Sequence, residues 1–444
     1  MRQTPVAPSL RAMKHILLGT LALLIATPAA AQLSKPEAKM AAAIDMEQAR
    51  TLALLERMVN QNSGSLNAPG VTAMYEIVRP EFETLGFTVQ WVDMKATGRA
   101  GHLIATHKGN SRGKRILLIG HLDTVFEPSS PFQAYKRDGD RAVGPGTVDD
   151  KGGISVILAA LRGMNAGGTL KNADIVVVLT GDEERVGAPV DAARKDLIDA
   201  GKWADVALEF EGLARDGGVD YGTVARRSSN NWTLTVTARS GHSGSIFTPD
   251  LGYGANFEMA RILDSWRREL VEKNLTYNVS VLAGGTPATI DAQGLSVAAS
   301  GKTNVIPTTA IARGDLRTLT REQDAHARER MQAIVAQHLP GTDAKLVVEA
   351  GYPPMAPTDG NRALLARLNQ VNRSLGLAEM PEYDPAKRGA ADSSFVAAYA
   401  DTIAGLGPDG GNSHAEGEYV DIPTIWLQAK RAAILISRLA AEKR

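Results

Sequence analysis

Three short runs of mainly apolar residues constrain the fold of this 444-residue chain more than any other feature. They are Ile116–Ile119, Ile175–Leu179 and Val206–Phe210, and each is followed by polar or glycine-containing sequence and then by a helical pattern. Such a run is typical of a strand that is buried on both faces, as in a parallel sheet covered by helices. The sequence therefore predicts an α/β fold with a mostly parallel sheet.

A different pattern interrupts this one between residues 226 and 350. The expected order is a strand at 232–238, a helix at 254–273, strands at 277–282 and 310–316, a helix at 321–338 and a strand at 345–349. This β-α-β-β-α-β order is ferredoxin-like. Because the first pattern then resumes, we expect residues 226–350 to form a small α+β domain inserted in a larger one, residues 41–225 and 351–444. Two domains also suit the length of the chain.

The first 31 residues have the pattern of an export signal. Arg11 and Lys14 precede an apolar run at 16–25, and small residues follow as far as Ala31. The run is too short to span a bilayer comfortably, so a cleaved secretory signal peptide is favoured over a membrane anchor. We expect residues 1–31 to be removed and the mature protein to be periplasmic or secreted, free of the membrane.

Charge and cysteine content exclude several classes of function. The 49 basic and 49 acidic residues give a formal net charge of zero, so nothing favours nucleic acid or an anionic membrane surface as a partner. The sequence has no cysteine, which excludes disulfides, thiol nucleophiles and thiolate metal ligands. Any metal ion would be held by His, Asp and Glu, which favours zinc or manganese over softer ions.

Acidic residues and histidines follow the predicted strands at the point where each strand ends. The first strand is followed by His121 and Asp123, the second by Glu183 and Glu184, and the third by Glu211. The carboxyl ends of parallel strands share one edge of a sheet, where open α/β folds bind ligands. Asp149 and Asp150 lie in a connection that leaves this edge. Each residue alone could be an ordinary surface group, but together they predict a functional site.

Six segments of the sequence form an informative series. They are Gly120-His-Leu-Asp-Thr-Val, Gly144-Pro-Gly-Thr-Val-Asp-Asp-Lys-Gly-Gly, Thr180-Gly-Asp-Glu-Glu, Phe210-Glu, Ser240-Gly-His-Ser-Gly and Ser413-His-Ala-Glu-Gly-Glu-Tyr-Val-Asp. The series resembles the di-zinc metallopeptidase family of glutamate carboxypeptidases, aminoacylases and succinyl-diaminopimelate desuccinylases, and is closest to the bacterial glutamate carboxypeptidase branch. The resemblance implies a zinc-exopeptidase catalytic domain, with residues 226–350 as its lid and dimerisation domain.

The resemblance also implies two zinc ions per chain, with cobalt or manganese as alternatives. It assigns His121, Asp149 and Glu211 to one ion, and Asp149, Glu184 and His414 to the other. Asp149 rather than Asp150 is the bridging acid because the family pattern places that acid two residues before the lysine, here Lys151. Three carboxylates leave one positive charge on two zinc ions, which a bridging hydroxide would cancel.

Further roles follow from the same resemblance. Glu183 would be the general base, and Asp123 would accept a hydrogen bond from His121 and so orient its ring. His242 would stabilise the oxyanion, reaching the site from the partner subunit of a homodimer. Asn304, Arg317 and Gly389 would bind substrate. Arg226 and Arg227, a charge pair near the domain boundary, are expected to be solvated rather than functional.

The predicted function is zinc-dependent hydrolysis of an amide bond beside a carboxylate-bearing residue, in small peptides or N-acyl amino acids. One alternative is an N-acyl amino acid deacylase of the aminoacylase kind. Others are a non-catalytic periplasmic binding protein, which would need no base such as Glu183, and a metal-dependent structural protein. The segment Gly351-Tyr-Pro has tyrosine where the glutamate-specific branch has arginine. Tyrosine cannot form a bidentate pair with a carboxylate, so we expect no strict preference for C-terminal glutamate.

Overall fold

The larger part of the protein is built on a six-stranded sheet. The structure is a computed structural model that describes Met1, residues 32–110 and residues 112–444. In spatial order the strands are β1 (Thr88–Asp93), β2 (Gly101–His107), β6 (Asp174–Thr180), β3 (Arg115–His121), β7 (Val206–Glu209) and β17 (Asp401–Ile403). β1 and β2 are antiparallel to their neighbours, whereas β6, β3, β7 and β17 are parallel. The predicted α/β fold with a mostly parallel sheet is confirmed.

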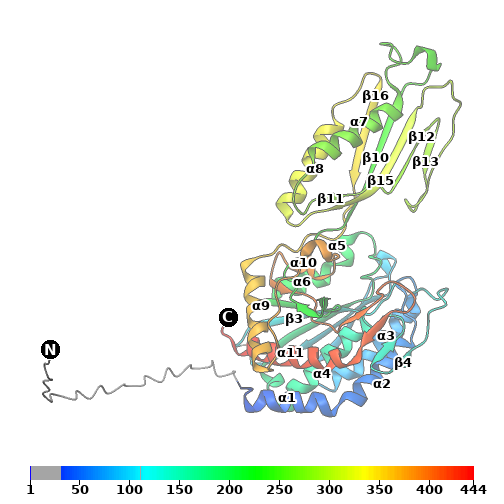
Figure 1. The fold of residues 1–444 in the computed structure, drawn as a ribbon. Helices are drawn as coiled ribbons and strands as arrows, with labels where there is room; N and C mark the ends of the chain where they lie inside the picture. The colour runs from blue at the N-terminus through cyan, green and yellow to red at the C-terminus, as the bar shows by residue number, and fades with distance from the viewer. Residues whose placement is uncertain (2–31, 111) are drawn as a thin grey trace.

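Helices cover both faces of this sheet (Figure 1). On one face α4 (Lys151–Gly167) and α11 (Ile422–Ala441) pack against β3, and on the other α6 (Lys195–Trp203) and α10 (Ser393–Val396) contact β3, β6 and β7. The side chains of Ile116–Ile119 are fully buried as a result. Burial on both faces explains why the central strands are continuous apolar runs.

The remaining elements of the larger part surround this core. They are α1 (Lys35–Met46), α2 (Gln48–Val59), α3 (Ala68–Glu83), α5 (Val190–Ala193) and α9 (Asp359–Ser374), the short strands β4 (Lys136–Asp138), β5 (Arg141–Val143), β18 (Gly410–Gly411) and β19 (Tyr419–Asp421), and the hairpin of β8 (Ala214–Asp216) and β9 (Val219–Tyr221). The strands β18, β19, β5 and β4 form a small sheet of their own. This small sheet joins the connection before α4 to the segment that carries His414.

Residues 230–348, here called the lid, form a second sheet with helices against it (Figure 1). Its strands are β10 (Asn230–Ala238), β11 (Thr276–Tyr277), β12 (Val281–Gly285), β15 (Thr309–Arg317) and β16 (Thr342–Val348), all antiparallel. The helices α7 (Gly254–Glu269) and α8 (Arg321–Val335) contact β10 or its neighbours. Trp232 and Trp266 meet edge to face at the centre of the lid's core. The predicted ferredoxin-like order is present, with the hairpin of β13 (Ala288–Ile290) and β14 (Val297–Ala299) added to it.

The apolar spacing of residues 41–59 predicts one amphipathic helix, but the structure has two helices there, α1 and α2. The break falls at Glu47, whose φ of −97° and ψ of 13° lie outside the α-helical region. α1 also begins earlier than expected, because Ser34 and Glu37 form a reciprocal capping box at its start. Residues 392–400 also have a helical pattern in the sequence, but only the four residues of α10 form a helix there.

Residues 2–31 of the predicted signal peptide lie outside the described residues, so their removal stays a prediction. None of the helices that the structure describes contains an apolar stretch long enough to cross a bilayer.

Candidate metal centre

His121 is the last residue of β3, and its imidazole is held from both sides. Its Nε2 lies 3.0 Å from Oδ1 of Asp149. Its Nδ1 lies 3.1 Å from the backbone oxygen of Asp123 and 3.4 Å from that residue's carboxylate. The ring is almost fully buried at 1% exposure. Both the carbonyl and the carboxylate of Asp123 therefore orient the ring that the sequence assigned to a metal ion.

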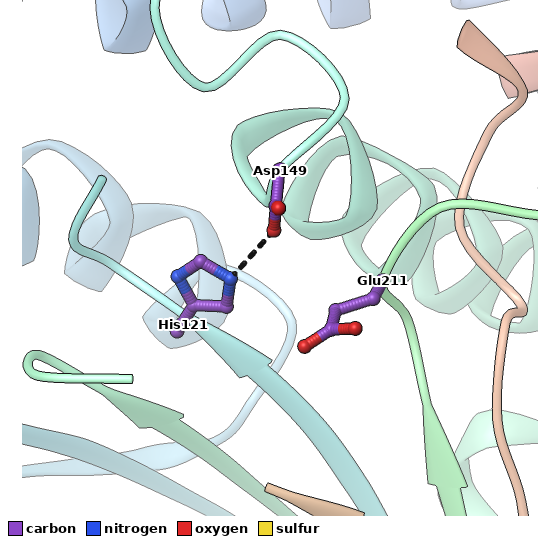
Figure 2. Close-up of side chains that lie close together, drawn as sticks. All are labelled: His121, Asp149 and Glu211. Atoms are coloured by element: carbon purple, nitrogen blue, oxygen red, sulfur yellow. Dashed lines mark hydrogen bonds and ion pairs between the residues drawn. The ribbon is translucent and has the colours of Figure 1, made fainter. Parts of the chain in front are cut away.

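The structure brings the five predicted metal ligands together in two overlapping groups. One consists of His121, Asp149 and Glu211 (Figure 2), and the other of Asp149, Glu184 and His414. In each group the potential ligand atoms lie within 4.8 Å of one another. The side chains come from the ends of β3, β6 and β7 and from two connections, as expected for the carboxyl edge of the sheet. Asp149 belongs to both groups, so two cations bound there would share it.

The connection before α4 separates the roles of the two adjacent aspartates. The backbone N–H of Asp149 donates to Oε1 of Glu418 over 3.1 Å, while Asp150 is fully buried and accepts the backbone N–H of His121 over 3.2 Å. Asp150 thus braces β3, and Asp149 alone faces the cluster. The chain passes so close here that a Cβ on Gly153 would lie 2.1 Å from the carbonyl oxygen of Phe210, which explains the second glycine after Lys151.

The pair Glu183 and Glu184 is anchored through its backbone. The N–H groups of both residues donate to the carboxylate of Asp123, over 3.0 and 3.1 Å, and the hydroxyl of Ser65 donates to the same carboxylate. On the other side, the hydroxyl of Tyr352 donates to the carbonyl oxygen of Glu183 over 2.6 Å. The backbone of the turn after β6 is therefore held from two sides.

His414 reaches the cluster from the segment between β18 and β19. Its Nε2 lies 3.0 Å from Oε2 of Glu184 and 3.2 Å from Oδ2 of Asp149. The hydrogen bonds to these two carboxylates raise the pKa of His414 to about 10. Its φ of 65° is in the left-handed region, which non-glycine residues seldom adopt outside functional loops.

Negative charge is concentrated at this edge of the sheet. Burial raises the pKa of Glu183 well above its usual value, and the neighbouring Glu211 raises it further. Burial also raises the pKa of Glu211 to about 8. In addition, Oε1 of Glu184 is buried without a hydrogen-bond partner among the described residues. Divalent cations would satisfy this oxygen and offset the charge, and a donor set of imidazole and carboxylate groups fits zinc, cobalt or manganese.

The expectation that Arg226 is a solvated charge is wrong. Arg226 is 2% exposed, and its Nη2 donates to Glu209 and to Glu211 over 2.7 Å each. Its Nη1 donates to the carbonyl oxygen of Gly389 over 2.9 Å. Arg226 therefore orients a predicted metal ligand and the predicted substrate loop together. Only the folding of the segment after β9 over the sheet edge creates these contacts, so no local sequence signal marks them.

A second buried arginine, Arg194, supports the turn after β6 and was not predicted. Its guanidinium is fully buried and bonds to Asp182 over 2.5 Å and to Asp392 over 2.7 Å. It also donates to the hydroxyl of Tyr352 over 3.3 Å. Despite the opposing effect of burial, Arg194 and its neighbours hold the pKa of Asp182 below its usual range. Tyr352, the residue that stands where the glutamate-specific branch has arginine, is part of the support under Glu183.

Two of the predicted lid residues, His242 and Asn304, lie away from this cluster. β10 starts beside the larger part, where Ser229 pairs with Tyr352, and runs outward for nine residues, or about 27 Å. His242 follows its far end, is exposed, and accepts the N–H of Gly244. Asn304 lies beside it, because its carbonyl accepts the N–H of Ser243.

Arg317 lies at the opposite end of the lid from His242. It ends β15 close to the larger part, and its Nε donates to Asp315 over 2.8 Å. The structure thus brings His242 and Asn304 together, but it places neither beside Arg317. Within one chain, the long β10 strand keeps His242 far from the predicted metal ligands.

Comparison with known proteins places the chain among hydrolases. A model of peptidase family M20/M25/M40 matches residues 117–438. The chain is 29% identical over 408 residues to carboxypeptidase G2 from Pseudomonas sp. (strain RS-16), covering 89% of this chain and 91% of the relative. It is 28% identical over 342 residues to succinyl-diaminopimelate desuccinylase from Novosphingobium aromaticivorans, covering 69% and 84%.

A solved structure shares the fold. A dinuclear metal-binding peptidase of the M20 family from Bacillus subtilis superposes with a TM-score of 0.62 at 15% identity, covering 89% of this chain and 99% of that one. Together with the family match, these findings confirm the resemblance that the sequence motifs carried. They also confirm an enzyme of the metallopeptidase and amidohydrolase class.

Proposed function

The chain belongs to peptidase family M20/M25/M40, and from this premise we propose that it hydrolyses an amide bond in small peptides or N-acyl amino acids with two zinc ions. The observation that carries the proposal is the pair of ligand groups that share Asp149. Glu183 belongs to neither group but adjoins Glu184 in the same anchored turn. The chain therefore offers both a place for two cations and a separate acid–base group.

Five side chains would hold the metal ions: His121 and Glu211 one ion, Glu184 and His414 the other, and Asp149 both. When bound, the two ions would act as Lewis acids and lower the pKa of water. Three carboxylates against four positive charges leave the occupied site with a charge of +1, whereas the carboxylates alone repel one another. Arg226 holds Glu211 in place from behind, as groups that support metal ligands commonly do.

Glu183 would take a proton from the attacking water and deliver it to the leaving amine. Its backbone is held by Asp123 on one side and Tyr352 on the other, which fixes the position from which the side chain acts. Burial keeps its pKa above the usual value. A raised pKa suits a group that must first accept a proton and then donate it near neutral pH.

A deacylase of N-acyl amino acids is the second candidate. The desuccinylase from Novosphingobium aromaticivorans, which aligns with 69% of this chain, favours it. The residues around the metal centre would perform the same amide hydrolysis in either case. The two candidates differ only in whether an amino acid or an acyl group precedes the scissile bond.

We expect the substrate side chain to be neutral or apolar rather than glutamate. The hydroxyl of Tyr352 already bonds to the carbonyl oxygen of Glu183 and to Arg194. It is therefore not available to a carboxylate on the substrate's side chain. Dipeptides that end in Leu, Ala and Glu, and N-acetyl-leucine as the deacylase substrate, should be compared by kcat/KM on zinc-loaded protein. Leu and Ala substrates should be cleaved better than the Glu substrate, whereas a strong preference for Glu would refute this expectation.

A further inference from the structure

Arg388 lines a small cavity beside the candidate metal centre. The residue follows the single helical turn Pro385–Lys387 and precedes α10. The cavity has a volume of about 140 Å³, and its walls include Asp149, Glu211 and Ser413. A guanidinium group and two of the proposed metal ligands therefore face the same space. No role for Arg388 follows from the sequence motifs.

The hydrogen bonds of Arg388 leave part of its guanidinium free. Its Nη2 donates to the carbonyl oxygen of Gly212 over 2.5 Å. Its Nε is buried and has no hydrogen-bond partner among the described residues. Within the part of the chain that the structure describes, no carboxylate oxygen lies within 4.0 Å of this guanidinium. A buried N–H donor without an acceptor costs about 1–3 kcal/mol. The guanidinium that carries it also lines the cavity, so Arg388 calls for an anionic partner there.

Arg388 is not needed to neutralise Glu209 and Glu211, because Arg226 already neutralises both carboxylates. Arg226 contacts both carboxylates at 2.7 Å. Burial and the neighbouring Arg226 lower the pKa of Arg388, while Glu211 and Glu209 only partly oppose them. Two guanidinium groups thus lie near each other on one side of the cluster, and only one of them has an anionic partner. The second favours an anion that is not part of the protein.

We propose that Arg388 binds the carboxylate group that adjoins the scissile amide bond of the substrate. This inference rests on the proposed function and adds the residue that recognises the substrate's charge. A carboxylate is the anion that peptides and N-acyl amino acids carry, and its planar shape matches a guanidinium. A cavity of about 140 Å³ accommodates this group, since one water molecule in the liquid fills about 30 Å³. Binding there would hold the neighbouring amide at the edge formed by Asp149 and Glu211.

The test compares Arg388→Gln with wild type on two matched substrates, an apolar dipeptide and the same dipeptide with its C-terminal carboxylate converted to an amide. In both, release of the N-terminal amino acid is measured on zinc-loaded protein. For the carboxylate substrate, KM should rise roughly 10- to 100-fold with little change in kcat, as expected for losing a charge-assisted hydrogen bond. The amide substrate should show no comparable change. In Arg388→Ala, added guanidinium ion should restore part of the lost affinity for the carboxylate substrate.

Lys387→Gln is the matched control. Lys387 carries the same charge one residue earlier but is exposed and pairs with Asp216 on the surface. Lys387→Gln should cleave both substrates with wild-type KM and kcat.

Two results would overturn the role of Arg388 while leaving the proposed function intact. One is an equal loss, or no loss, on the two substrates. The other is a loss of bound zinc in Arg388→Gln, which would mean that Arg388 serves the metal ligands. If wild-type protein with two zinc ions cleaves neither these substrates nor N-acetyl-leucine, the proposed function fails and this inference fails with it.

Discussion

Glu183→Ala should lose about 10²- to 10⁴-fold in kcat while still binding two metal ions per chain, because positioned general acid–base groups contribute this much. Glu183 belongs to neither ligand group, and its carboxyl group is the one whose pKa burial raises most clearly at the end of β6. Its backbone contacts to Asp123 and Tyr352 do not depend on the side chain. The substitution should therefore leave the fold and the ligands in place and remove only the proton transfer. Metal content and kcat measured on the same sample decide the matter.

The matched control is Glu184→Ala, at the next position in the same turn. Glu184 lies with Asp149 and His414 in one ligand group, and its Oε2 is 3.0 Å from the imidazole of His414. This variant should lose one metal ion per chain together with activity. If Glu183→Ala is the variant that drops to one metal ion, the roles of the two glutamates have been exchanged.

His242→Ala should lose about 10²- to 10³-fold in kcat, the usual effect of removing an oxyanion donor, and a partner chain should restore the activity. Within one chain, β10 places His242 roughly 27 Å beyond the end of the lid that adjoins the metal centre. We therefore propose that the active unit is a homodimer in which His242 serves the opposite subunit. Phe247 and Phe257, which are both more than half exposed and pack against each other close to His242, offer an apolar surface for such a contact.

A mixed dimer of Glu183→Ala and His242→Ala chains separates this proposal from its alternatives. The chains carry different affinity tags, so that only mixed dimers are purified. If His242 acts across the interface, the His242→Ala subunit keeps its own Glu183 and receives an intact His242, so the dimer regains about half of the wild-type activity. If His242 acts within its own chain, every site keeps one defect. A verified mixed dimer without recovery would contradict the proposal, and full activity of His242→Ala alone would show that the residue merely caps a turn of the lid.

The sequence predicted the sheet and a functional site at its edge for the same physical reason, whereas the metal-ligand roles, including those of Asp149 and His414, came from the family resemblance. Strands buried on both faces must be continuously apolar, so β3, β6 and β7 could be recognised as apolar runs in the sequence. The polar residues that follow these strands then had to meet at one edge of the sheet. Boundaries that depend on local capping were less accurate: the break at Glu47 and the early start of α1 at Ser34 follow from backbone geometry and a capping box.

The arginines around the cluster could not be found in this way. Arg226, Arg194 and Arg388 act through contacts with segments from 12 to 198 residues away, such as Asp182 and Asp392 around Arg194. In sequence each is one of many charged residues in polar surroundings, where exposure is the default. Only the packed structure shows that Arg226 is already paired with carboxylates while Arg388 is not.

Metal titration of chelator-treated protein shows whether two bound ions are needed for hydrolysis. The two groups that share Asp149 should hold two ions, and hydrolysis should depend on both. Metal content and the rate of cleavage of an apolar dipeptide should be measured together as zinc is added back. We predict no cleavage by the metal-free protein and full activity when two zinc ions are bound per chain. Undiminished cleavage by metal-free protein, or saturation of binding and activity at a single ion, would contradict the account.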